Sequence, residues 1–242
     1  MKIDNGTLTQ VTEQDINPDG TFVIPAGVTA IGDHAFHYCA GLTTLTIPDS
    51  VTTIGDSAFS GCSGLSMLTI PNSVTIIGSY AFWDCIRLTT LTVPDSVTTI
   101  GDNAFRDCSG LSTLTIPDGV TTIADNAFSY WRELTTLTIP DSVIAIGDDV
   151  FYDCDALEHI YVRQTQKGGL ERIRDLLPAH LRDKIAAVSP AGCLTKRAGT
   201  LSTVGSDELK MLGLFEAAEP ALPLATLLEE SEKQISTPGK CN

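Results

Sequence analysis

One stretch of the chain decides the fold, and it reads Leu42-Thr-Thr-Leu-Thr-Ile-Pro-Asp-Ser-Val-Thr-Thr-Ile-Gly-Asp-Ser-Ala-Phe-Ser-Gly-Cys-Ser-Gly64. Variants of it recur every 23 residues, and an Ile-Pro or Val-Pro pair ends at Pro25, Pro48, Pro71, Pro94, Pro117 and Pro140. Leucine, phenylalanine and cysteine recur with the same period, and Trp131 takes one place in the cysteine column. A unit this short buries its apolar side chains only by stacking on its neighbours, so the period predicts a repeat solenoid.

The first residues of each unit alternate as a half-buried strand does. Leu45 and Ile47 are expected to point into the core, while the threonines between them point outward. Pro48 has no backbone N–H and ends the regular pairing. Asp56 is placed to cap a short helical turn that carries Phe59.

The full pattern is Leu-x-x-Leu-x-Ile-Pro-x-x-Val-x-x-Ile-Gly-x-x-Ala-Phe-x-x-Cys-x-x-Leu, and it resembles the BspA-like leucine-rich repeat family over residues 21–162. The resemblance implies a curved solenoid with short parallel strands on its concave face, and with loops and short helical turns on the convex side. Members of that family are surface antigens, adhesins and secreted effectors that bind other macromolecules. The repeats imply no catalysis.

Four segments are expected along the chain. A turn signal, Asn17-Pro18-Asp19-Gly20, separates the first repeat from a degenerate start. After the last strand the apolar spacing becomes helical, with a break at Pro178 and a second short helix through Val188. The segments are an N-terminal cap (1–20), the leucine-rich repeat solenoid (21–163), a helical C-terminal cap (164–188), and a linker with a short helical or flexible tail (189–242).

The chain of 242 residues has a formal net charge of −15, and its first 162 residues carry 4 basic and 20 acidic side chains. This acidity disfavours nucleic acid and anionic membrane surfaces as partners, and it favours basic proteins. No run of 18 apolar residues predicts a membrane span. The first residues show no apolar segment of a signal peptide. We expect a monomer that stays in the bacterial cytoplasm until export, with the host cytosol as its destination.

Three sets of recurring residues suggest chemical roles. Five of the seven cysteines share one repeat position, which suits buried thiols in a reducing destination better than disulfides or zinc. Aspartate recurs at two turn positions, where turn and cap chemistry is favoured over divalent cations held between coils. The outward Thr-x-Thr pairs suit exposed strands, with ice binding as an alternative. No catalytic motif, cofactor site or metal site is predicted.

Departures from the repeat at exposed positions are candidates for partner recognition, because Tyr, Trp and Arg are common interface anchors. The predicted partner-binding residues are Tyr38, Trp83, Arg87, Arg106, Tyr130, Arg132, His159, Tyr161 and Arg163. We expect most of them along one lateral or convex edge, with His159, Tyr161 and Arg163 on the concave side. Trp131 is expected to be buried in the cysteine column.

The sequence therefore favours a non-enzymatic protein-interaction scaffold, and a bacterial secreted effector that binds a host protein is the first hypothesis. A glutamate-rich stretch, Glu229-Glu230-Ser231-Glu232, resembles the C-terminal signal of type IV secretion effectors. A cell-surface adhesin is the second hypothesis. A ubiquitin-ligase adaptor is the third, because Leu177-Pro178-Ala179-His180-Leu181 resembles the opening of an F-box.

Overall fold

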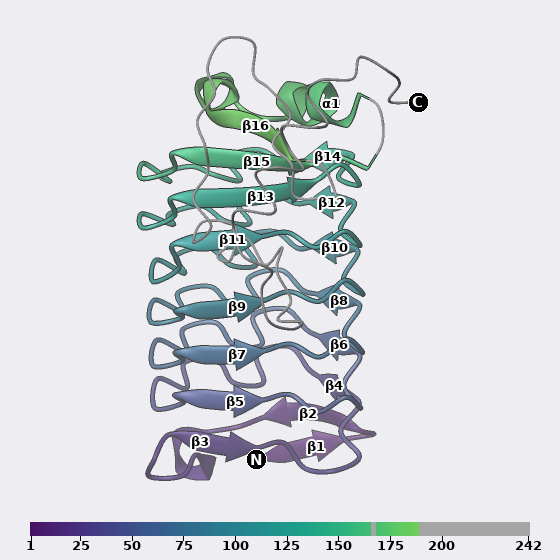
Figure 1. Cartoon of the computed structure of the whole chain (residues 1–242). Helices are drawn as coiled ribbons and strands as arrows, with labels where there is room; N and C mark the ends of the chain where they lie inside the picture. Colours follow the sequence, from purple (N-terminus) through teal and green to yellow (C-terminus); the bar gives the residue numbers. More distant parts are fainter. Residues whose placement is uncertain (166–167, 189–242) are drawn as a thin grey trace, which may run out of the picture. The chain divides into compact units, whose positions relative to one another are not determined.

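The computed structural model describes residues 1–165 and 168–188, which form a parallel β-solenoid and so confirm the predicted fold (Figure 1). Each 23-residue coil contributes one strand to a first sheet, one strand to a second sheet, and a run of turns to a third side. Strands of neighbouring coils pair in parallel with a register of one repeat, as Leu45 pairs with Leu68. Residues at the same position of successive repeats therefore lie directly above one another in the structure.

The first sheet contains the strands that the repeat pattern predicts. Leu45 is buried and Thr46 is exposed, as the alternation requires. In the part of the chain that the structure describes, no strand pairing joins β9 to β11, and Leu91 of β9 is only half-buried (Figure 1). The strands are β3 (Thr21–Val23), β5 (Thr44–Thr46), β7 (Met67–Thr69) and β9 (Thr90–Thr92) before this break, and β11 (Thr113–Thr115), β13 (Thr136–Pro140), β15 (His159–Arg163) and β16 (Ile185–Val188) after it.

The second sheet was not expected from the sequence, because most of its strands have only two residues and show no alternation. In each two-residue strand the second residue faces the core, and Ile54 and Ile100 are fully buried. An antiparallel hairpin precedes the regular coils, so the N-terminal cap is built as a partial coil. The order is β1 (Lys2–Asp4), β2 (Thr7–Gln10), β4 (Ala30–Ile31), β6 (Thr53–Ile54), β8 (Ile76–Ile77), β10 (Thr99–Ile100), β12 (Thr122–Ile123) and β14 (Ala145–Ile146).

The third side, which we call the turn face, comprises residues 33–38 and their equivalents every 23 residues. Where short helical turns were expected, the structure has successive turns with two left-handed residues per coil. In the first such coil φ is 58° at His34 and 59° at Tyr38. Alternate backbone N–H groups then donate to carbonyls of the next coil, as Phe36 donates to Ala58 at 2.7 Å. The turn face is thus held by a third ladder of hydrogen bonds.

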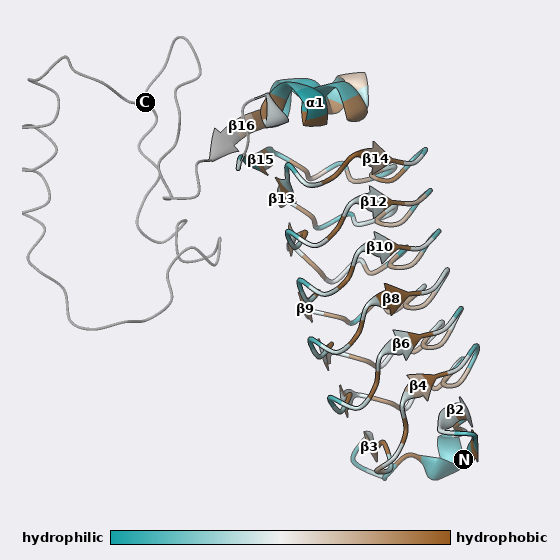
Figure 2. Ribbon diagram, turned by 90° about the vertical axis from the view of Figure 1, so that its right-hand side faces the viewer, coloured by the Kyte–Doolittle hydropathy of each residue, from teal (hydrophilic) through white to brown (hydrophobic). Residues whose placement is uncertain are grey.

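The buried apolar side chains of all coils form one continuous core. Figure 2, in which the ribbon is coloured by hydropathy, shows the coils stacked one above another. The centre of the core is a stack of phenylalanine rings. The ring centroids of Phe36 and Phe59 lie 4.8 Å apart, and those of Phe128 and Phe151 lie 6.0 Å apart. Burial of one such ring is worth about 1.5–3 kcal/mol before the entropy of ordering is subtracted. The stack therefore couples each coil to its neighbours.

The C-terminal cap closes the open end of this core. Helix α1 (Gly169–Leu176) buries Ile173 on it, and the 3-10 helix η2 (Ala179–Lys184) buries Leu181. Leu177, between the two helices, is also buried. The predicted second helix through Val188 is wrong in its last residues: Ile185–Val188 form strand β16, which pairs with β15. Pairing satisfies backbone groups that a sheet edge leaves open, and a helix would not.

The N-terminal coil also contains a short 3-10 helix, η1 (Glu13–Asp15). No helix among the described residues is long and apolar enough to cross a membrane. The predicted linker and tail, including the glutamate-rich stretch at residues 229–232, lie outside the described residues.

Candidate functional site

The turn face carries most of the side chains that depart from the repeat. Its variable positions are the two left-handed residues and the residue before the second of them. Tyr38, Tyr80 and Tyr152 occupy such positions and remain exposed. The regular side chains between them point into the core, as Phe36 does. The turn face therefore combines a constant backbone with changing side chains.

Three of these side chains, Arg106, Tyr130 and Tyr152, gather near the C-terminal end of the turn face. Arg132 joins them from the loop that follows Tyr130, and we call the four the aromatic–arginine cluster. The guanidinium carbon of Arg106 lies 4.7 Å from the centroid of the Tyr130 ring, and that of Arg132 lies 5.9 Å from it. The rings of Tyr130 and Tyr152 meet edge to face at 5.5 Å. Cation–π and aromatic contacts thus hold the cluster together across three coils.

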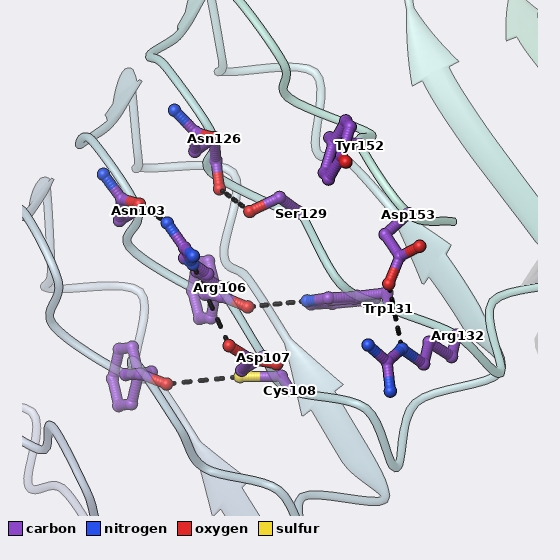
Figure 3. Close-up of polar contacts among 12 residues, drawn as sticks. Asn103, Arg106, Asp107, Cys108, Asn126, Ser129, Trp131, Arg132, Tyr152 and Asp153 are labelled. Carbon is purple, nitrogen blue, oxygen red and sulfur yellow. Dashed lines mark hydrogen bonds and ion pairs between the residues drawn. The ribbon is translucent and has the colours of Figure 1, made fainter. Parts of the chain in front are cut away.

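Ion pairs and hydrogen bonds restrain both arginines of the cluster (Figure 3). Arg132 Nε donates to Asp153 Oδ2 at 2.9 Å, and this carboxylate raises the pKa of Arg132 above its ordinary value. Arg106 Nη1 donates to Asn103 Oδ1 at 3.2 Å, and Arg106 Nε lies 3.8 Å from Asp107 Oδ2. The Arg132 side chain is nevertheless 67% exposed, so its remaining N–H groups face solvent.

Two smaller groups lie farther toward the N-terminus of the turn face. The ring of Tyr38 contacts His37, and its Cδ1 atom lies where a Cβ on Gly61 would approach to 2.3 Å. Burial, and then His34, lower the pKa of His37 below its usual value. Trp83 is half-buried, and its ring meets that of Tyr80 at 6.2 Å. Tyr38 and Trp83 thus lie on the predicted edge, but on coils other than those of the aromatic–arginine cluster.

The remaining predicted residues lie elsewhere. Arg87 is exposed in the loop before β9, and His159 is exposed on β15. Arg163, also on β15, donates to Asp118 Oδ1 at 2.7 Å. The expected exposure of Tyr161 is wrong: this side chain, on the strand between β13 and β16, is 9% exposed.

Tyr152 was missed as a site residue, although it follows Phe151 in the variable column that also supplied Arg106. Tyr152 belongs to the cluster because its ring contacts Tyr130. Tyr130 occupies a different repeat position in the preceding coil, so the repeat pattern alone does not reveal this contact. Tyr80 was also passed over, although its ring partner Trp83 lies three residues further along the same coil. A comparison of adjacent coils at these columns would have found Tyr152.

The five cysteines of the repeat are buried free thiols, as the sequence analysis inferred. Cys108 Sγ donates to the carbonyl oxygen of Phe82 at 3.2 Å, and Trp131 Nε1 makes the same contact with Phe105 at 2.6 Å (Figure 3). Trp131 is fully buried, which confirms its expected role as a replacement for cysteine. Burial raises the pKa of Cys154 to about 11, which disfavours the reactive thiolate at neutral pH.

The aspartate columns serve the backbone. Asp33 Oδ1 accepts from the N–H of Asp56 at 2.9 Å, and Asp125 Oδ1 accepts from the N–H of Asp148 at 2.8 Å. This agrees with the favoured turn chemistry, except that the amide belongs to the next coil. In the described ranges no group of three or more His, Cys, Asp or Glu residues could hold a metal ion.

The Thr-x-Thr pairs lie in register on the first sheet, as Thr113 and Thr115 do with Thr136 and Thr138. Met67 enters the same array, and the break between β9 and β11 divides it. These interruptions weaken the ice-binding alternative, which needs a regular surface.

Stacked 23-residue coils, a leucine-lined parallel sheet and a variable turn face define the chain as a leucine-rich repeat solenoid. Residues 29–158 match the family model of the BspA type leucine rich repeat region in 6 copies. The chain belongs to this family.

Similar solved structures come from bacteria, and those with TM-scores above 0.5 share the fold. A leucine-rich repeat protein of T. pallidum is 22% identical, with a TM-score of 0.59 over 71% of this chain and 97% of that one. The pneumococcal vaccine antigen PcpA is 19% identical, with a TM-score of 0.56 over 75% of this chain and 42% of that one. A leucine rich cell surface protein of Faecalibacterium prausnitzii is 29% identical, with a TM-score of 0.47 over 69% of this chain and 37% of that one. No curated protein sequence matches the chain.

Proposed function

We propose that this protein is a non-enzymatic scaffold that binds another protein through the turn face, with the aromatic–arginine cluster as its centre. The contacts of Tyr130 with two arginines and with Tyr152 support this proposal. Rings and guanidinium groups that are already held in place lose less entropy on binding than free side chains do. They are also the residue types that dominate binding energy at protein interfaces.

The charge of the solenoid supports a basic partner. Arg106 and Arg132 are two of only four basic side chains in residues 1–162, and each is near an aspartate. The acidic surroundings attract a basic protein and accelerate its encounter, while the cluster supplies the anchoring contacts.

The test compares capture of a host or bacterial surface protein by the full chain and by the double variant Tyr130→Ala plus Arg132→Ala. The matched control is Thr99→Ala plus Thr122→Ala, which removes two outward side chains of the second sheet. We expect the partner to be lost with the first variant and retained with the control, at equal melting temperatures. Equal recovery with both variants would exclude the cluster as the binding centre.

For the cellular role we propose a secreted effector with a host partner, and a surface adhesin is the alternative. The sequence pattern at residues 229–232 motivates the first, so export should fail in a chain without residues 225–242. Unchanged export would favour the adhesin. The adaptor hypothesis loses its basis, because Leu177, Leu181 and Ile185 are buried on the solenoid and residues 185–188 form a strand.

A further inference from the structure

The ion pair between Arg132 and Asp153 joins two neighbouring coils of the turn face. Arg132 follows Tyr130, the second left-handed residue of its coil, by two positions. Its Nε donates at 2.9 Å to the carboxylate of Asp153, the second left-handed residue of the next coil (Figure 3). Its guanidinium carbon lies 5.9 Å from the centroid of the Tyr130 ring. The protein itself thus shows where a guanidinium group lies on this column, in contact with one coil and the next.

Two repeats earlier, the same column contains two carboxylates. Asp84 and Asp107 occupy there the positions of Tyr130 and Asp153. The position of the arginine is taken by Ile86, which has no charge. A guanidinium group at the equivalent place would therefore contact Asp107 on one side and Asp84 on the other.

These two carboxylates lack a cation between them. The Asp84 side chain is half-buried, and its carboxylate makes no hydrogen bond or ion pair with residues 1–165 and 168–188. Burial, and then the Asp107 carboxylate, raise the pKa of Asp84. Asp107 has a long contact of 3.8 Å with Arg106 Nε, because the Arg106 guanidinium is held by the Tyr130 ring and by Asn103. A further cation would relieve the repulsion between the two carboxylates.

Apolar side chains of the same coil suit the stem of an arginine. Ile86 is 44% exposed, and Trp83, which precedes Asp84, is half-buried. Arginine packs its methylene groups on such surfaces while its charged end stays with carboxylates. A planar guanidinium group also has N–H groups on more than one edge, so it can donate to both carboxylates, unlike the point charge of lysine. Arg87, in the next loop, forms no ion pair in the part of the chain that the structure describes.

We propose that the turn face binds an arginine side chain of a partner protein between Asp84 and Asp107, in the place that Arg132 occupies two coils later. This inference rests on the proposed function and names the side chain by which the basic partner is recognised. The contact of Arg132 with Asp153 and Tyr130 carries the inference, because it identifies guanidinium as the group that fits this column.

The first experiment titrates the peptide acetyl-Gly-Arg-Gly-amide into the full chain and follows the side-chain signals of Asp84, Asp107 and Trp83 by NMR. We expect saturable shifts of all three. The same peptide with citrulline, a neutral analogue of arginine, should leave them unchanged. The double variant Asp84→Asn plus Asp107→Asn should bind the arginine peptide about fivefold or more weakly. It keeps the backbone, because asparagine tolerates the left-handed conformation of both residues.

The matched control is Asp49→Asn plus Asp155→Asn, which removes the same charge from two exposed carboxylates elsewhere on the solenoid. It should change the affinity for the arginine peptide by less than about twofold. Equal weakening by both double variants would show that the net charge attracts the peptide, and it would overturn the inference.

The second experiment fills the place from within the chain. Ile86→Arg puts a guanidinium group at the position of Arg132, so it should abolish the shifts caused by the arginine peptide and raise the melting temperature. Ile86→Gln, which adds no charge, should keep the peptide binding. Unchanged peptide binding in the Ile86→Arg variant would contradict the proposed place.

The inference and the proposed function can fail separately. Absence of saturable shifts, equal shifts with the citrulline peptide, or the same shifts with calcium chloride alone would overturn the arginine site. If a partner is still captured through Tyr130 and Arg132 in that case, the proposed function stands alone. If the arginine peptide binds as described but capture does not depend on those two residues, the proposed function fails instead.

Discussion

At the scale of single residues, one acceptor explains the cysteine column and its exception. From Phe36 to Phe128, the carbonyl of the core phenylalanine accepts a hydrogen bond inside the core from a thiol or an indole N–H of the next coil. Cysteine suits this position because it is small and apolar and donates weakly. Trp131 donates to the carbonyl of Phe105 through its indole N–H, which is a stronger donor than a thiol. Its larger ring changes the packing, but the hydrogen bond of the cysteine column is kept.

The variant Trp131→Phe should therefore destabilise the protein by about 0.5–1.5 kcal/mol, since the Phe105 carbonyl loses the indole donor and keeps only the N–H of Cys108 at 3.3 Å. The matched control is Trp83→Phe, at a half-buried indole on the turn face, where the expected change is within about 0.5 kcal/mol. Urea unfolding of both variants measures the difference. Equal losses would mean that ring volume, not the N–H group, decides the effect.

Asp84 offers a pH-dependent prediction. Burial, and then the Asp107 carboxylate, raise its pKa above the ordinary value. A carboxyl group with a raised pKa in the folded state opposes folding once it is ionised, and this cost disappears as the pH falls through the raised pKa. Asp84→Asn should therefore raise the melting temperature near about pH 7, and asparagine also suits the left-handed backbone there.

The gain from Asp84→Asn should shrink in acid, where the wild-type group is neutral too. Thermal unfolding between about pH 3 and pH 8 tests this, with the exposed Asp155→Asn as control. A gain that is independent of pH would point to turn propensity instead of charge.

At the scale of elements, one aspartate of a repeat column attaches the C-terminal cap to the solenoid. Asp141 stands in the same column as the exposed Asp49, but it is 4% exposed. Its carboxylate accepts from the N–H and the hydroxyl of Thr165 at 2.7 and 2.6 Å, and its carbonyl accepts from Arg172. Lys184 similarly donates to the carbonyl of Leu157 in the last coil. The basic side chains of the cap thus bind acceptors that the last coil leaves open.

Loss of this attachment is testable with Asp141→Ala, which should cost about 1–3 kcal/mol because the N–H and the hydroxyl of Thr165 lose a charged acceptor. Hydrogen exchange should accelerate in α1 and β16 before it does in the central coils. Asp49→Ala removes the equivalent exposed carboxylate and should cost less than about 0.5 kcal/mol. If both substitutions had the same effect, Asp141 would not be the attachment point.

The sequence predicted the elements that the repeat pattern encodes directly and missed those that depend on neighbouring coils. Leu45 and Ile47 revealed the first sheet because their side chains alternate. A two-residue strand such as β6 has no periodicity, and only its partner strands define it. The left-handed positions escaped notice because His34 and Tyr38 are not glycines, the usual mark of that conformation. The aromatic–arginine cluster combines side chains from three coils, so single-column reading found three members but not Tyr152.

At the scale of the whole solenoid, coupling between coils is uneven. The second sheet and the phenylalanine stack run through all regular coils, but the first sheet is broken between β9 and β11. Repeat proteins derive their cooperativity from contacts between neighbours. The interface that lacks one of its ladders is therefore the weakest step in the stack.

Hydrogen exchange should locate this weak step at Ser112. The N–H of Thr135 donates to Ser112 at 2.8 Å and that of Thr89 donates to Ser66 at 3.1 Å, whereas the N–H of Ser112 has no acceptor among the described residues. We expect its exchange to be at least about tenfold faster than that of Thr135, its equivalent in the next coil. Equal protection of the two amides would show that the sheet closes in solution.

The one-way polarity of the turn-face ladder has a consequence for how such chains lengthen. A coil inserted anywhere in the stack brings three donors for the coil after it and three acceptors for the coil before it. The Asp33 and Asp56 column behaves in the same manner, since each carboxylate serves the following coil. Duplication of one whole repeat in the gene would therefore leave both ends chemically unchanged, and the same two caps would fit a shorter or a longer protein.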